Sequence, residues 1–277
     1  MFKIALKIAI VALVAYGAYF YFIEYYETPD DVPEVSYEEV IAEDEEVSAG
    51  SEEVIAEDEE VGAGSEEVIE ELGEEIGDET LETFETSFPD EFNLAVPFTS
   101  QAPHADWGLP YQEACEEASA FMVSLYYKGE PAGQINADVA DAGILEAIEF
   151  ENDYLGFYLD TTAAETADFI DMFYGLSTTV IDNPTVEQIK AEIAAGRPVI
   201  VPAAGRELGN PNFSGAGPLY HMFVIKGYTK DRFITNDPGT RNGESYVYDI
   251  DVIMDAMGDW NNGDPANGAK RIILVAP

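Results

Sequence analysis

The spacing of apolar residues predicts three helices in the second half of the chain. Along residues 113–127 apolar side chains recur every three to four positions, as on one face of a helix. Residues 163–174 show a similar pattern. Residues 185–188, Thr-Val-Glu-Gln, form a capping box that begins a third helix, and Gly196 ends it. The apolar positions of the first helix are Ala118, Phe121, Met122 and Leu125.

Short apolar runs between turn residues predict strands. A continuous Val-Ile-Val run at 199–201 is typical of a buried strand, and Thr229-Lys230 lies between two runs that predict a β-hairpin. Because helices come first and an antiparallel sheet follows, we expect an α+β domain over residues 91–277. The predicted strands are 93–98, 199–201, 221–228, 232–236, 245–248 and 271–275.

The N-terminus carries an uninterrupted apolar run from Ile8 to Ile23, preceded by Lys3 and Lys7. If the Lys7 side chain reaches the headgroups, the apolar stretch extends from Ile4 to Ile23, and its roughly 20 residues are long enough to span a bilayer. We therefore predict a transmembrane signal anchor at 1–23, with a cytoplasmic N-terminus and the rest of the chain outside the cell membrane. A cleaved signal peptide is the alternative.

Residues 24–90 are strongly acidic, with 28 Asp and Glu and no Lys or Arg. Glu-Glu-Val-Ile-Ala occurs at 38–42 and again at 52–56, so the repeat has a period of 14 residues. Valine recurs every seven residues, which is compatible with a coiled coil. Since only one heptad position is apolar and no cation offsets the acidic charge, we favour a disordered acidic linker.

Composition excludes several classes of partner and cofactor. The formal net charge of -44, from 56 acidic and 12 basic residues, argues against nucleic-acid binding. A single cysteine, Cys115, excludes an internal disulfide and a zinc site with several thiolates. Residues 259–264 have the wrong glycine position for a calcium loop and are interpreted as a surface turn. We therefore expect no cofactor and no metal; the sequence leaves the oligomeric state open.

Three residues have the chemistry of a thiol hydrolase. Cys115 lies in the first turn of the predicted helix, where free N–H groups and the helix dipole favour an anion. His221 begins one strand of the hairpin and Asp237 ends the other, so the turn places them within about one residue of facing each other. Taken separately, a buried structural cysteine and a solvated histidine are equally good interpretations.

Four segments together resemble a known family: 96–103 followed by Trp107 and Cys115, then 196–201, 221–228 and 236–238. The chain resembles the bacteriocin-processing, double-glycine type of cysteine peptidase, in its stand-alone branch without a transporter. This resemblance implies a papain-like fold and hydrolysis of a peptide or protein substrate. It also implies roles: Gln101 as oxyanion donor, Cys115 as nucleophile, His221 as base and Asp237 as the residue that orients the base.

Glu116 and Glu117 follow the cysteine directly. Helical geometry turns them by about 100° and 200° from Cys115, so we expect their side chains to point away from the thiol. If they faced it, their charge would raise the thiol pKa. Two other functions are therefore open. One is a non-catalytic peptide-binding module of the same fold, and the other is a cell-wall amidase or acyltransferase.

Overall fold

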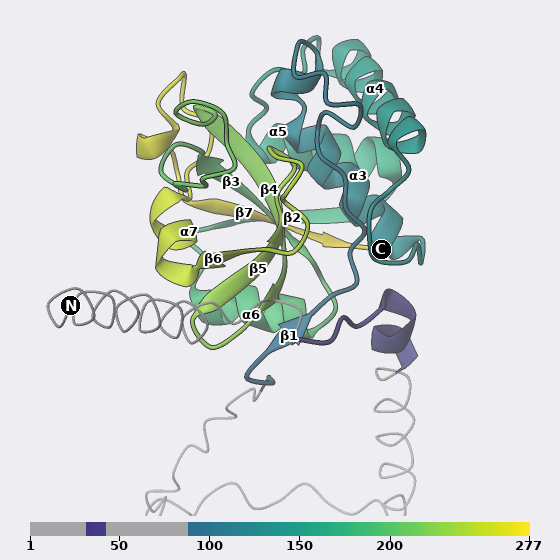
Figure 1. Ribbon diagram of the computed structural model, residues 1–277, viewed down its shortest axis with the longest axis vertical. Helices are drawn as coiled ribbons and strands as arrows, with labels where there is room; N and C mark the ends of the chain where they lie inside the picture. Colours follow the sequence, from purple (N-terminus) through teal and green to yellow (C-terminus); the bar gives the residue numbers. More distant parts are fainter. Residues whose placement is uncertain (1–31, 43–87) are drawn as a thin grey trace, which may run out of the picture.

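The computed structural model describes residues 32–42 and 88–277, and residues 92–276 hold a single antiparallel sheet with helices around it (Figure 1). This is the α+β architecture expected from the sequence. The predicted membrane anchor and most of the predicted acidic linker lie outside the described residues. Within the described ranges, no helix is both long and apolar enough to cross a membrane.

The sheet has the strand order β2-β7-β3-β4-β5-β6, and every neighbouring pair is antiparallel. The short β1 pairs with β4 outside this path. All nine residues of β4 are buried, as are all six of β3, so the centre of the sheet is the core of the domain. The strands are β1 Phe92–Asn93, β2 Ser177–Asp182, β3 Val199–Ala204, β4 Tyr220–Tyr228, β5 Arg232–Asn236, β6 Tyr246–Asp249 and β7 Arg271–Ala276.

Figure 1 shows α3, α4 and α5 gathered on the upper right of the sheet, while α7 lies on its left and α6 at its lower end. Helix α3 packs on β4, which fixes its first residue close to the strand that carries His221. The capping box predicted at Thr185 is confirmed, because Thr185 and Gln188 satisfy each other's backbone N–H groups. The helices are α3 Cys115–Tyr127, α4 Ala137–Tyr154, α5 Ala163–Phe169, α6 Val186–Ala194 and α7 Ile250–Ala256, with short turns η2 Tyr111–Glu113, η3 Ile170–Tyr174 and η4 Pro265–Asn267.

Helix α4 and strand β2 were not expected from the apolar pattern. In α4 the buried face includes Glu151 and two alanines, so the contrast between its faces is weak. Its start is set by Asn136, whose side chain accepts hydrogen bonds from two first-turn N–H groups. Strand β2 alternates between exposed and half-buried residues. Both elements depend on their neighbours more than on their own hydrophobicity.

The β4–β5 hairpin contains a bulge between Ile225 and Gly227. Near the turn Tyr228 pairs with Phe233, but beyond the bulge Val224 pairs with Asn236, which is a register shifted by one residue. Side chains alternate between faces of a sheet, so a one-residue shift changes which residues share a face. If the pairing seen near the turn continued along the whole hairpin, Asp237 would lie on the opposite face of the sheet from His221. The bulge puts both on one face.

Residues 32–42 pack against the domain, although the sequence boundary at residue 91 assigned them to the acidic linker. Val35 bridges to Leu94, and Val32 and Val40 are buried. The ring of Tyr37 meets those of Tyr126 and Tyr127 edge to face. This stretch is therefore part of the folded unit.

Candidate active site

Cys115 is the first residue of α3 and is 5% exposed. Its thiol donates to Oε2 of Glu116 over 3.0 Å, and the backbone N–H of Met222 donates to Sγ over 3.3 Å. Met222 directly follows His221 on β4, so the sulfur lies against the strand that carries the histidine. In the described part of the chain, the thiol has no hydrogen bond to His221 itself.

The expected orientation is wrong for Glu116, but no contact of Glu117 with the thiol contradicts it for Glu117. Glu116 contacts the thiol, and both Glu116 and Glu117 are buried. The predicted helix was assigned one apolar face, whereas eleven of the 13 residues of α3 are buried because α4, the sheet and neighbouring loops surround it. A glutamate side chain in the first turn therefore finds no solvent and folds back onto the thiol.

Burial, followed by the charge of Glu116 and its hydrogen bond, raises the pKa of the Cys115 thiol well above its ordinary value. The Met222 N–H acts in the opposite direction. Burial also raises the pKa of Glu116, to about 8. The resting site therefore holds a neutral thiol beside a carboxyl group that is itself protonated near neutral pH.

His221 and Asp237 form a buried pair, with 2.8 Å between Nε2 and Oδ1. The two residues are 1% and 0% exposed. Because Nε2 faces the carboxylate, the tautomer that this contact favours carries its proton on Nε2 and leaves Nδ1 as the basic nitrogen. The histidine ring also meets the ring of Phe213 edge to face.

Asp237 accepts further hydrogen bonds from three groups. Gly239 N–H donates to Oδ1 over 2.9 Å, while Tyr248 and Asn210 donate to Oδ2 over 2.6 and 3.1 Å. Burial opposes its charge, but the imidazole of His221 and these hydrogen bonds outweigh burial and lower the pKa of Asp237. The carboxylate is therefore ionised and fully hydrogen-bonded. Gly239 also fits closely, since a Cβ atom there would lie 2.9 Å from Cε1 of His221.

Gln101 lies beside the same site. Its backbone N–H donates to the carbonyl of Pro238, next to Asp237. Its side-chain nitrogen donates to the carbonyls of Tyr111 and Gln112 over 2.9 Å each, while Oε1 is buried without a partner among the described residues. Through its side chain and its backbone together, Gln101 connects the segment before α3 to the loop after β5.

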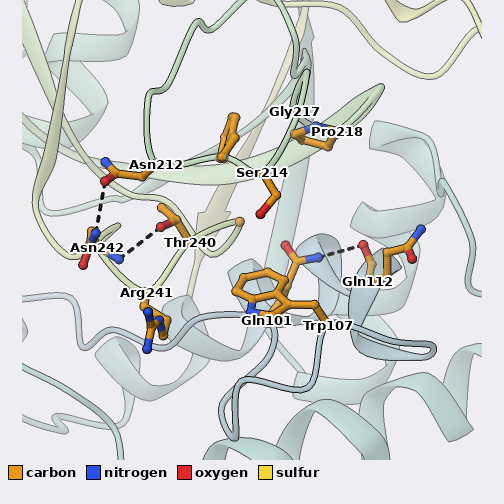
Figure 2. A pocket seen from close by; sticks show the side chains of 12 residues that line it. Gln101, Trp107, Gln112, Asn212, Ser214, Gly217, Pro218, Thr240, Arg241 and Asn242 are labelled. Atoms are coloured by element: carbon orange, nitrogen blue, oxygen red, sulfur yellow. Dashed lines mark hydrogen bonds between the residues drawn. The ribbon is translucent and has the colours of Figure 1, made fainter.

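A cavity of about 470 Å³ lies next to this site, and Figure 2 shows the side chains that line it. Gln101 lines it, and so do Phe213 and Gly239, which both contact His221. The cavity is therefore bordered by two residues that pack against His221, although His221 itself is not among the residues that line it. Its lining residues are Gln101, Trp107, Gln112, Asn212, Phe213, Ser214, Gly217, Pro218, Gly239, Thr240, Arg241 and Asn242.

The model of the Peptidase_C39 like family matches residues 93–264, which include all four candidate residues. The chain belongs to this family. Among solved structures, the chain is similar to a C39-like peptidase from Bacillus anthracis, with 13% identity and a TM-score of 0.46 over 68% of this chain and 98% of that one. No curated protein matches the chain.

Sequence reasoning missed several groups around the site of this C39-like protein. Tyr248 and Asn210 hold the carboxylate of Asp237, but neither carries a local signal, because one is a strand residue and the other lies in a long loop. Glu117 and Glu151 lie together in the interior, and among the described residues their carboxyl groups have no hydrogen-bond partner other than each other. Burial, and then the charge of Glu151, raise the pKa of Glu117. Within the described residues, no cluster of His, Cys, Asp and Glu is arranged to hold a metal ion.

Proposed function

We propose that the protein is a cysteine peptidase that hydrolyses peptide bonds through Cys115, His221 and Asp237. Membership of the C39-like family supports the coarse activity. The observation that carries the residue assignment is the buried His221–Asp237 pair, with the Cys115 sulfur bound to the adjacent backbone N–H.

In this mechanism Nδ1 of His221 accepts the proton of the thiol, and the Cys115 thiolate attacks the carbonyl carbon of the substrate. The imidazolium then gives its proton to the leaving amine as the C–N bond breaks. Water, deprotonated by His221, hydrolyses the thioester and restores the thiol. Asp237 holds the imidazole in position and stabilises its positive charge throughout.

Two groups near the start of α3 are proposed to stabilise the oxyanion. The N–H of Cys115 lies in the first turn, where backbone donors have no intrahelical partner. Gln101 is the second, and its amide hydrogens are directed at the carbonyls of Tyr111 and Gln112. An oxyanion at this position replaces one of these carbonyls as acceptor, since catalytic hydrogen bonds often form only in the substrate complex.

We also propose that residues 1–23 anchor the protein in the cell membrane, with the peptidase domain outside the cell. The apolar run after Lys3 and Lys7 supports this orientation. Fractionation of cells that produce the full chain, with protease added from outside to intact cells, tests it. Recovery of the chain in the soluble cytoplasmic fraction contradicts the anchor.

The catalytic assignment is tested with a fluorogenic peptide library and the variants Cys115→Ala, His221→Ala and Asp237→Asn. We expect Cys115→Ala to abolish turnover and His221→Ala to lower kcat/KM at least about 100-fold, the usual contribution of a general base. Purified peptidoglycan serves as a parallel substrate, because the same triad acts on any amide. Full turnover by Cys115→Ala contradicts the mechanism.

A non-catalytic peptide-binding module is the second candidate, and the contact between Glu116 and the thiol favours it, since this contact raises the thiol pKa. For such a module, peptides bind without turnover and with equal affinity in the wild type and Cys115→Ala. Alkylation by iodoacetamide separates the two functions as well. We expect His221→Ala to slow alkylation of Cys115 in a peptidase and to have no effect in a binding module.

A further inference from the structure

The cavity beside His221 has an unusual lining for so acidic a chain. The protein carries 56 Asp and Glu residues, yet none of the twelve lining residues in the described part of the chain is acidic. Neutral hydrogen-bonding side chains dominate instead, including three amides and two hydroxyls from Gln112, Asn212, Asn242, Ser214 and Thr240. Such a lining accommodates an anionic group without repulsion between like charges.

Arg241 supplies the positive charge of this cavity. Figure 2 shows it on the same loop as Thr240 and Asn242, with Gln101 and Trp107 to its right in the view. Arg197, Arg232 and Arg271 each pair with a described carboxylate, whereas Arg241 makes no salt bridge within the described residues. Its guanidinium is therefore available to a ligand.

The loops that carry these groups are held in place. Asn242 donates to Asn212 over 3.0 Å, and Asn212 donates to Asn210, which in turn binds Asp237. This chain of amides connects the loop of Arg241 to the catalytic carboxylate. Opposite it, Trp107 is 39% exposed and offers a rigid ring for a substrate backbone or an aliphatic stem.

A planar guanidinium binds a carboxylate through two parallel N–H donors, which gives both affinity and orientation. We propose that this cavity is a specificity subsite that binds the side-chain carboxylate of an Asp or Glu residue in the peptide substrate, with Arg241 as its charged partner. The inference rests on the proposed peptidase function, because it assigns the substrate class of that same site.

The source of the acidic peptide is either another protein or the chain's own acidic residues 43–87. Intact mass spectrometry of the purified full chain distinguishes these. If the N-terminal part is lost at a rate that does not depend on protein concentration, and this loss does not occur in Cys115→Ala, the substrate is the chain's own acidic segment. An intact chain that cleaves added acidic peptides indicates another protein.

The subsite is tested with pairs of fluorogenic peptides that differ only by Glu or Gln, with the pair placed at each position around the scissile bond. At one position we expect wild-type kcat/KM to be about 10- to 100-fold higher for Glu, the range of a charged hydrogen-bonded pair. In Arg241→Gln this ratio falls to about one, and in Arg241→Lys it is intermediate. Arg206→Gln, an exposed arginine that does not line the cavity, is the matched control and keeps the wild-type ratio.

Binding is measured separately on Cys115→Ala protein by fluorescence anisotropy of the same labelled peptides. This arm reports on the subsite even when no peptide is cleaved, so failure of the peptidase assignment and failure of the subsite are distinguishable. The subsite is supported if Cys115→Ala protein binds the Glu peptide more tightly than the Gln peptide, and if this preference disappears in the double variant Cys115→Ala with Arg241→Gln. Equal affinity for Glu and Gln peptides at every position, or a preference that survives Arg241→Gln, overturns it.

Discussion

The side chains of Cys115 and Glu116 touch in the buried interior, 3.0 Å apart. An ionised Glu116 repels the thiolate and raises the thiol pKa, whereas a protonated Glu116 donates a hydrogen bond to it. Burial raises the pKa of Glu116 to about 8, and the charges of Glu151 and Asp160 add to this effect. The charge of Glu116 therefore adds to burial in opposing the ionisation of Cys115. Glu117 and Tyr220 also face this pair of residues.

We predict that Glu116→Gln lowers the apparent pKa of the Cys115 thiol, because a neutral amide removes the repulsion between the carboxylate and the thiolate. The difference in alkylation rate between Glu116→Gln and the wild type grows as pH rises through about 8, because Glu116 of the wild type ionises there. The pH dependence of the rate of alkylation by iodoacetamide measures it. Glu149→Gln, an exposed carboxylate on α4, is the control. An unchanged thiol pKa in Glu116→Gln means that the contact has no electrostatic effect.

Lys226 stands at the bulge of the β4–β5 hairpin, and its ammonium group is buried. It donates to Glu34, to Oδ1 of Asn93 over 3.0 Å and to the carbonyl of Leu94 over 3.1 Å. Three donors therefore meet three acceptors, one of which comes from residues 32–42. Since the bulge places His221 and Asp237 on one face of the sheet, this N-terminal segment supports the geometry of the site from the far end of the hairpin.

We predict that Glu34→Gln lowers the free energy of unfolding by about 1–3 kcal/mol, because it weakens the neutralisation of a buried ammonium group. Chemical denaturation measures the loss, and hydrogen exchange at residues 225–227 is expected to accelerate. Glu38→Gln, an exposed neighbour with no ion pair to a described residue, should change stability by less than about 0.5 kcal/mol. Equal effects of the two substitutions contradict a specific role for Glu34.

Over the whole molecule, buried carboxyl groups make stability depend on pH. Glu116, Glu117 and Glu151 are buried around α3, and burial raises the pKa of each above the ordinary value of 4.5. In the folded state these groups bind protons that the unfolded chain releases, so stability falls as pH rises from 4.5 through the folded pKa values. Asp237 acts oppositely, because its lowered pKa gives stability that is lost only as pH falls below 3.8.

We therefore predict a higher Tm at pH 5 than at pH 8, and partial flattening of this dependence in the double variant Glu117→Gln with Glu151→Gln. Each retained proton contributes up to about 1.4 kcal/mol per pH unit. Differential scanning calorimetry at constant ionic strength measures the trend. The surface charge of this acidic chain acts in the same direction, so the comparison with the double variant isolates the buried groups. An identical slope in both proteins rules out Glu117 and Glu151 as its cause.

The elements whose signals lie within a few residues could be predicted from the sequence. The helix that begins at Cys115, the Thr185 capping box and the hairpin with His221 and Asp237 all occur where periodicity and turn residues place them. Helix α4 could not be predicted in this way, because its buried face contains Glu151, whose environment is created by α3. The acidic composition of residues 32–42 likewise led to their assignment to the linker, although Val35 and Tyr37 pack them against the domain.

By itself, the sequence determined the α+β class, the family resemblance and the proximity of His221 to Asp237, because local hydrogen bonding and side-chain periodicity are properties of short segments. Only the tertiary structure decided which face those two residues share, where Glu116 points, which carbonyls Gln101 binds and that Arg241 lines the cavity. Each of these depends on register or on contact between distant segments. A single bulged residue or one buried first turn is enough to change them.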